Sequence, residues 1–182
     1  DRCGRRGYPP DPSKNDEYAF YQNLLGAWPL APLNEETRGM FIERMKNMFL
    51  KTSREAKMHT SWTNPNILYE NALMRFVEGS LGASNNRFQN DFLSFHEDIA
   101  WFGMLNSLSQ VFLKLVAPGI PDIYQGNETW RFCLVDPDNR RPVDFARRQS
   151  MLFSLLERMH AENAQRETLQ QELLADLSDG RA

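Results

Sequence analysis

The sequence A-P-G-I-P-D-I-Y-Q-G-N-E, residues 117–128, decides the fold. β-Branched and aromatic side chains lie between Ile120 and Tyr124, and proline and glycine bound this short run on both sides. The pattern predicts one β-strand over 120–124. A single strand cannot satisfy its own backbone groups, and unpaired groups are costly when buried. We therefore expect this strand to pair with strands outside the 182 residues or with a second copy of the chain.

Helical patterns flank the predicted strand. Apolar residues recur at three- and four-residue steps from Phe88 to Ala117, and again from Met151 to Met159. The first pattern predicts one long helix or two stacked ones, with Gly103 marking either a break or a point of close packing. Helix, strand, helix is the order found in (β/α) barrels, whose active sites lie at the C-terminal ends of the strands. The loop after the strand is therefore expected to face a site.

Three further helices are predicted upstream. Ser13 and Asn34 are suitable N-caps for the first two, and Asn64-Pro65 predicts the start of the third. The third helix is expected to end at Gly79 and Gly82. In the second helix, Met and Phe side chains recur on one face, and such a stripe predicts packing in a core.

The predicted fold is mainly α: a helical subdomain joined to the last helix-strand-helix portion of a (β/α)8 TIM barrel. An irregular segment is expected over residues 1–12, followed by the helical subdomain over 13–85. The barrel part is expected over 86–161, with its last strand at 120–124. Residues 162–182 are expected to begin a helical C-terminal region.

Composition and charge exclude several classes of function. The chain is 41% apolar and 25% charged, which is typical of a folded domain. The net charge of −3 lacks the basic excess of nucleic-acid-binding proteins, so no nucleic acid is expected as a partner. Two cysteines, Cys3 and Cys133, form no disulfide framework, and no residues have metal-ligand spacing. We therefore predict no metal, no cofactor and no membrane association, and a cytoplasmic location.

Candidate substrate-binding residues lie in the loop after the predicted strand. They combine aromatic rings, which can stack on a sugar, with carboxylate, amide and guanidinium groups, which can bind its hydroxyl groups. They are Tyr124, Gln125, Glu128, Trp130, Asp136, Asn139, Arg140 and Arg141. A structural alternative stays open for each type: the carboxylates can pair with the two arginines to hold the loop, and the aromatic rings can pack at the end of the barrel.

Several motifs resemble a known family. The run from Ala117 resembles the last barrel strand of α-amylase-family enzymes. Five other segments resemble the maltooligosyltrehalose synthase family in particular, in the expected order along nearly the whole chain. They are S-K-N-D-E-Y from Ser13, L-L-G-A-W-P from Leu24, H-T-S-W-T-N-P-N from His59, G-M-L-N-S-L from Gly103 and L-V-D-P-D-N-R-R-P-V-D-F from Leu134. One departure lies at 127–130, where the family more often has Thr-Glu-Leu-Trp; the Glu and the Trp are still in place.

The resemblance implies a C-terminal fragment of an enzyme that converts the reducing-end α-1,4 linkage of a maltooligosaccharide into an α,α-1,1 linkage. The resemblance also implies a retaining mechanism, in which two carboxyl groups lie about 5 Å apart across the scissile bond. No stretch here resembles the family motifs that carry those groups, so no catalytic residue is assigned. The implied partners are a maltooligosaccharide and the N-terminal catalytic part of the parent enzyme. Two alternatives stay open: another α-amylase-family hydrolase or glucanotransferase, and a stand-alone helical interaction module.

Overall fold

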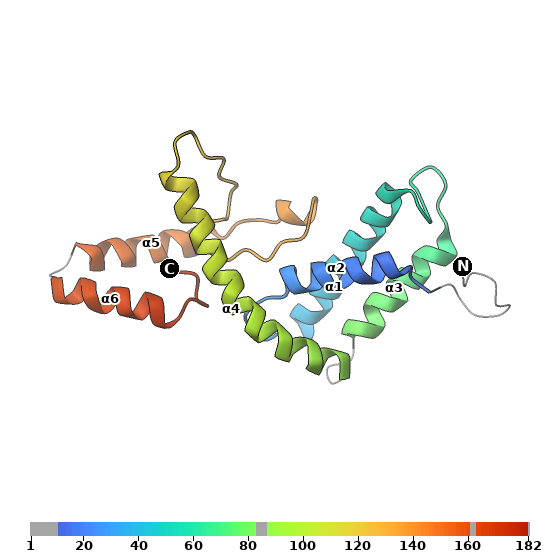
Figure 1. Ribbon diagram of the computed structural model, residues 1–182, viewed down its shortest axis with the longest axis horizontal. Coiled ribbons are helices and arrows are strands. Elements are labelled where there is room, and N and C mark those ends of the chain that lie inside the picture. The colour runs from blue at the N-terminus through green and yellow to red at the C-terminus, as the bar shows by residue number, and fades with distance from the viewer. Residues whose placement is uncertain (1–10, 83–86, 161–162, 182) are drawn as a thin grey trace. The chain divides into compact units, whose positions relative to one another are not determined.

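A computed structural model describes residues 11–82, 87–160 and 163–181. Within these residues the fold consists of helices and irregular segments, with no β-strand (Figure 1). The prediction of a mainly α fold is therefore confirmed for them. The helices are α1 (Lys14–Ala27), α2 (Glu35–Ala56), α3 (Ile67–Leu81), α4 (Arg87–Val116), the short 3-10 helix η1 (Asp138–Arg140), α5 (Phe145–Met159) and α6 (Asn163–Ala175).

The strand predicted over 120–124 does not form in the described structure. These residues have no regular secondary structure, and Ile120 is fully exposed. The physical reason is that a strand is defined by hydrogen bonds to a neighbouring strand, and no described segment offers one. The barrel part of the predicted fold is accordingly not shown by the described residues.

The predicted helix starts are largely confirmed. The Ser13 side chain accepts a hydrogen bond from the Asp16 amide, and Asn34 and Thr37 form a reciprocal capping box at the start of α2. The start of α3 needs a correction, because the N-cap is Asn66 rather than Asn64. The Asn64 amide instead donates to the Ser61 hydroxyl at 3.0 Å, which keeps it in the preceding turn.

The chain divides into two compact units. Unit 1 contains the described parts of 1–96 together with 132–140, and unit 2 contains the described parts of 97–131 and 141–182. Helix α4 contributes to both units and continues through Gly103 without a break. The domain boundaries expected from the sequence stay predictions, and most of the expected irregular segment 1–12, with Cys3, lies outside the described residues.

Unit 1 is built around an aromatic core. Phe20 of α1 has T-shaped contact with Phe76, and Trp28 has T-shaped contacts with Phe41 and Phe92. The Met and Phe stripe predicted for α2 is buried here, which confirms that prediction. The core consists of Phe20, Leu24, Ala27, Trp28, Phe41, Ile42, Met45, Met48, Phe49, Val77, Leu81 and Leu134. The last of these comes from the remote segment 132–140, so this segment is part of the fold of the unit.

A buried ion pair holds the turn between α2 and α3. Glu70 is only 5% exposed, and both of its oxygens accept hydrogen bonds from the Arg54 guanidinium, at 2.8 and 2.7 Å. The Thr60 hydroxyl donates to the same carboxylate at 2.6 Å. These hydrogen bonds, those from Arg54 above all, lower the pKa of Glu70 although burial opposes them. The negative charge of Glu70 is therefore a structural element of unit 1.

Unit 2 leaves many apolar side chains uncovered. Helices α5 and α6 pack together, with an ion pair between Arg158 and Glu172 at 2.7 Å. Outside this contact the apolar faces are exposed, as Phe112 illustrates with 64% of its surface accessible. The exposed apolar residues of α4 and α5 include Trp101, Phe102, Leu105, Val111, Phe112, Leu113, Leu115, Val116, Phe145, Leu152, Phe153 and Met159.

Helix α4 is long and apolar enough to cross a membrane, judged by length and composition alone, and no other described helix is. The sequence analysis did not recognise this, because Asn106, Gln110 and Lys114 interrupt the apolar run. One such helix is weak evidence for a membrane, since helices that pack against other protein segments have similar composition. The expectation of no membrane association stays a prediction.

The Glu70 ion pair predicts a pH-dependent contribution to stability. Glu70→Gln should lower the free energy of unfolding by about 1–3 kcal/mol at pH 7, because the Arg54 guanidinium loses its buried counter-charge. Because the pKa of Glu70 is lowered in the folded state, its contribution is complete above the unfolded-state value of about 4.3. The contribution is lost as the pH falls through the folded-state pKa, so the difference from wild type should shrink in acid.

Denaturant unfolding of both proteins at pH 7 and at pH 3 measures this difference. Glu78→Gln is the matched control, because this carboxylate is 64% exposed and lies 3.6 Å from the Lys46 ammonium. Equal free energies of unfolding of the two variants at pH 7 would show that the buried ion pair stabilises the protein no more than the exposed one does.

Candidate functional site

The predicted substrate-binding residues are distributed over both units. Three of them, Asp136, Asn139 and Arg140, lie in the segment 132–140 of unit 1. The other five, Tyr124, Gln125, Glu128, Trp130 and Arg141, lie in unit 2. The geometry of each group is therefore described within its own unit.

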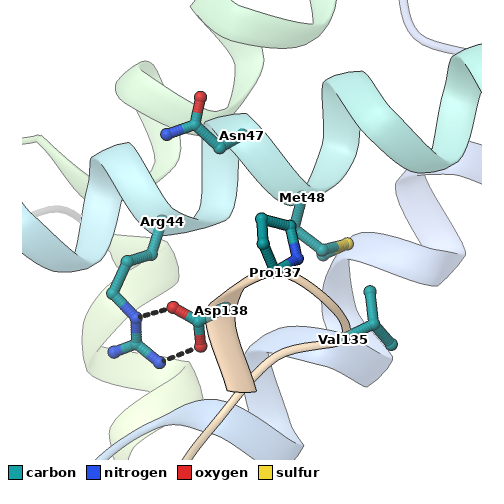
Figure 2. A pocket seen from close by; sticks show the side chains of 6 residues that line it. All are labelled: Arg44, Asn47, Met48, Val135, Pro137 and Asp138. Atoms are coloured by element: carbon teal, nitrogen blue, oxygen red, sulfur yellow. Dashed lines mark hydrogen bonds and ion pairs between the residues drawn. The ribbon is translucent and has the colours of Figure 1, made fainter. Parts of the chain in front are cut away.

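The unit 1 segment 132–140, called here the aspartate loop, is bound to α2 by a guanidinium group. Arg44 Nε donates to Asp138 Oδ1 at 2.7 Å, and Nη2 donates to Oδ2 at 2.8 Å (Figure 2). Nη2 also donates to the carbonyl oxygen of Phe132 at 2.7 Å. One side chain of α2 thus holds the aspartate loop at two places, six residues apart along the chain.

A second cation of α2 contacts the same loop. Lys51 donates to the backbone carbonyl of Asp136, and its ammonium group lies 3.6 Å from the Asp136 carboxylate. Asp136 also forms an ion pair with Arg140. The Arg140 side chain is nevertheless 71% exposed, so most of this guanidinium is accessible to a ligand. Of the predicted site residues, the structure therefore brings Asp136 and Arg140 together.

The aspartate loop is compact because Asp138 forms hydrogen bonds to other residues of the loop. Asp138 Oδ2 accepts from the Leu134 amide at 2.7 Å, and the Asp138 amide donates to the Val135 carbonyl at 3.0 Å. Residues of the loop and of α2 line a small cavity of about 160 Å³ in unit 1 (Figure 2). Its lining consists of Arg44, Asn47, Met48, Val135, Pro137 and Asp138.

In unit 2, two arginines organise the segment around Gly126. Arg148 of α5 donates to Glu128, to the Gly126 carbonyl and to the Thr129 hydroxyl, at 3.0 to 3.1 Å. Arg131 donates to the carbonyls of Gln125 and Arg141, which joins two predicted site residues through their backbone. The φ of Gly126 is +85°, a left-handed conformation that favours glycine.

The unit 2 site residues differ in what remains available for a ligand. Tyr124 and Gln125 are exposed, whereas Trp130 is partly buried and its indole N–H donates to the Leu177 carbonyl. Gly180 packs against the same indole, where a Cβ atom would lie 3.3 Å away. This arrangement favours packing rather than sugar stacking for Trp130.

Glu128 is unsuited to act as a proton donor at neutral pH. A hydrogen bond from its own backbone amide, together with the guanidinium of Arg148, holds the pKa of Glu128 below its usual value. A general acid needs a raised pKa in order to keep its proton at pH 7. Glu128 is therefore a carboxylate in this structure and can accept hydrogen bonds from sugar hydroxyls.

Four residues that organise these loops were missed in the sequence analysis: Arg44, Lys51, Arg131 and Arg148. Arg44 and Lys51 lie on one side of α2, two turns apart, beside its buried stripe. A pair of cations seven residues apart at the edge of an apolar face was an available signal. No sequence pattern indicated the role of Arg148, because the oxygen atoms that accept its hydrogen bonds lie some 20 residues away along the chain.

Comparisons with known proteins connect this geometry to a class of protein. No family model matches the chain. A protein of Mycobacterium tuberculosis called "Putative maltooligosyl trehalose synthase" is 33% identical over 146 residues, or 80% of this chain. The chain spans 18% of the length of that relative.

Solved structures give a similar result. A crystal structure of a maltooligosyl trehalose synthase is 41% identical over 94% of this chain, with a TM-score of 0.78, and the match covers 21% of that structure. A structure named DSM5389 glycosyltrehalose synthase is 44% identical over 80% of this chain and 19% of its own, with a TM-score of 0.70. A maltooligosyltrehalose synthase from Arthrobacter ramosus is 35% identical over 76% of this chain and 17% of its own, with a TM-score of 0.66.

These similar proteins are enzymes, so the chain matches a fragment of an enzyme. The curated and solved neighbours are named maltooligosyl trehalose synthase, and the chain matches a fragment of that enzyme at 33–44% identity over 80–94% of its own length. The resemblance found in the sequence motifs is thereby confirmed.

The contacts of Arg148 predict its effect on the segment 126–129. Arg148→Lys should raise amide exchange in this segment at least about tenfold, because a lysine ammonium cannot reach three separate acceptors in the fixed geometry of a guanidinium. Arg147→Lys is the control, since Arg147 is exposed and its backbone amide, not its side chain, donates to Asp144. Equal exchange in the two variants would contradict the assignment.

Proposed function

We propose that this chain is part of an enzyme that converts the reducing-end α-1,4 linkage of a maltooligosaccharide into an α,α-1,1 linkage. The observation that carries the proposal is the similarity to maltooligosyl trehalose synthases, at 41% identity over 94% of the chain in one solved structure. The reaction is an intramolecular transglucosylation in trehalose formation. The parent would be an isomerase of the α-amylase family, glycoside hydrolase family 13, with its barrel in the cytoplasm.

The proposed reaction consumes no water. The bond from the anomeric carbon of the penultimate glucose to O4 of the terminal glucose breaks as that carbon bonds to the carboxylate nucleophile, and O4 receives a proton from an acid. The anomeric hydroxyl oxygen of the terminal glucose then bonds to the same carbon and displaces the carboxylate, and its proton returns to the conjugate base of the acid. Such a step requires a nucleophile and an acid about 5 Å apart, and in our proposal both belong to the N-terminal part of the parent.

In this proposal the chain binds and orients the sugar. The accessible guanidinium of Arg140, held by Asp136, has the donors to bind sugar hydroxyls, and the ionised Glu128 has the acceptors. Tyr124 offers an exposed aromatic ring. Further proposed contacts are Asn139 in unit 1 and, separately, Gln125 and Arg141 in unit 2, whereas the packing of Trp130 supports a structural role.

The exposed apolar residues of α4 and α5 support a protein partner. Side chains such as Trp101, Phe112 and Phe153 expose more apolar surface than a free-standing domain usually does. Because the chain spans about a fifth of the length of its relatives, we propose that the N-terminal catalytic part of the parent covers these faces.

The proposal predicts that this chain alone is inactive. Purified chain incubated with maltopentaose should leave the reducing ends unchanged, because the nucleophile and the acid are both absent. The longer protein that contains this chain should remove the reducing ends without releasing free glucose. Turnover by the chain alone near the enzyme median of ~10 per second would show that catalytic residues lie within it.

Arg140 is predicted to contribute to substrate binding. In the longer protein, Arg140→Ala should lower kcat/KM for maltopentaose by about ten- to a thousandfold, because a misplaced substrate reacts slowly. The melting temperature should change little, since the ion pair with Asp136 is exposed. Arg87→Ala is the control, as this side chain is 96% exposed. Unchanged kinetics with a lowered melting temperature would assign Arg140 a purely structural role.

A further inference from the structure

We propose that Arg44 of α2 is a positioning residue for the substrate-binding part of the aspartate loop. This inference rests on the proposed function, because it names a further residue on which that function depends. Arg44 is not itself a substrate contact in this proposal. It acts through Asp138 and Phe132, and thereby determines where Asp136 and Arg140 lie.

The Arg44 contact has the properties of a strong and specific interaction. Three hydrogen bonds of 2.7 to 2.8 Å leave this guanidinium, two to the Asp138 carboxylate and one to the Phe132 carbonyl. The two side chains are only 20% and 10% exposed, so water competes weakly for either partner. Charge-assisted bidentate pairs of this kind are stronger and more directional than other hydrogen bonds.

The aspartate loop has little regular structure of its own. Its only regular element is the three-residue turn η1, and its apolar anchor is Leu134, which is 6% exposed in the unit 1 core. Leu134 fixes the position of the loop at one point, and Lys51 contacts it at Asp136. The bidentate bond from Arg44 to Asp138, four residues after Leu134, adds a directional contact. Residues 136 and 140 flank Asp138 and are therefore placed with it.

Arg44 is better suited to this task than its neighbours on α2. Lys51 reaches the Asp136 carbonyl, but an ammonium group is a point charge that does not define an orientation. Lys46 pairs with Glu43 and Glu78 instead. A planar guanidinium bound at both ends of the loop can set both its position and its direction.

A purely stabilising role for Arg44 makes a different forecast. If the ion pair merely contributes to the stability of unit 1, its loss lowers the melting temperature, while the enzyme that remains folded keeps its kinetics. If Arg44 positions the loop, its loss also weakens the contribution of Arg140 to substrate binding. The coupling between Arg44 and Arg140 therefore distinguishes the two roles.

The test is a double-mutant cycle in the longer protein, with maltopentaose as substrate. Arg44→Met keeps an unbranched apolar stem in place of the arginine stem and removes its hydrogen bonds, and should lower kcat/KM at least about tenfold. In the Arg44→Met background, adding Arg140→Ala should cost less than a third of what it costs in wild type, because Arg140 is no longer well placed. Arg44→Lys should retain intermediate activity. Lys46→Met is the matched control and should stay within about twofold of wild type.

Additive effects of Arg44→Met and Arg140→Ala, or equal kinetics of Arg44→Met and Lys46→Met, would overturn the proposal. If Arg44→Met does not fold, Asp138→Asn takes its place in the cycle. The asparagine keeps the shape of the side chain and an acceptor for the Leu134 amide, but loses the charge that Arg44 binds.

Amide exchange over residues 132–140 separates this inference from the proposed function. If wild type and Lys46→Met both fail to convert maltopentaose, the proposed function fails. In that case, exchange at least about tenfold faster in Arg44→Met than in Lys46→Met still supports the positioning of the loop by Arg44. Equal exchange in these two variants overturns it.

Discussion

One ion pair connects the two parts of unit 1 that are far apart in the sequence. Arg44 and Asp138 are separated by 94 residues, and their bidentate contact holds the aspartate loop on α2. The same carboxylate accepts a hydrogen bond from the Leu134 amide. Leu134 can therefore enter the core while its backbone N–H keeps a hydrogen-bond acceptor. Without this contact, the loop would lose its bidentate attachment to α2 and would keep only the contact of Lys51 with Asp136 as a cation contact from this helix. The placement of the proposed sugar-binding groups in unit 1 depends on this bidentate attachment.

The two units differ in how completely they bury their apolar residues. Unit 1 encloses Phe20, Leu24 and Met45 fully and supports them with the Glu70 ion pair. In unit 2, α4 and α5 expose large apolar side chains along much of their length. Helices with this composition need a partner in order to be stable in water. This difference agrees with a chain that corresponds to about a fifth of its relatives.

Local signals accounted for much of the helical structure. Ser13 and Asn34 carry their caps within three residues, so the starts of α1 and α2 could be predicted from short-range hydrogen bonding. The start of α3 was misplaced by two residues, because Asn64 and Asn66 are both capable caps and the Ser61 hydroxyl binds the first of them. The strand over 120–124 was predicted from side-chain propensity, but a strand also needs a neighbour, which the described residues do not contain.

By itself, the sequence determined the helical class, the buried stripe of α2 and the motifs that relate the chain to maltooligosyl trehalose synthases. These properties depend on residues that are close in the chain or on the identity of short segments. Only the tertiary structure decided that Arg44 binds Asp138, that Arg148 binds Glu128 and that Trp130 donates to Leu177. A charged or aromatic side chain can bind any suitable acceptor within reach. Which acceptor lies within reach is set by packing between segments some 20 to 90 residues apart, and spacing along the chain does not encode it.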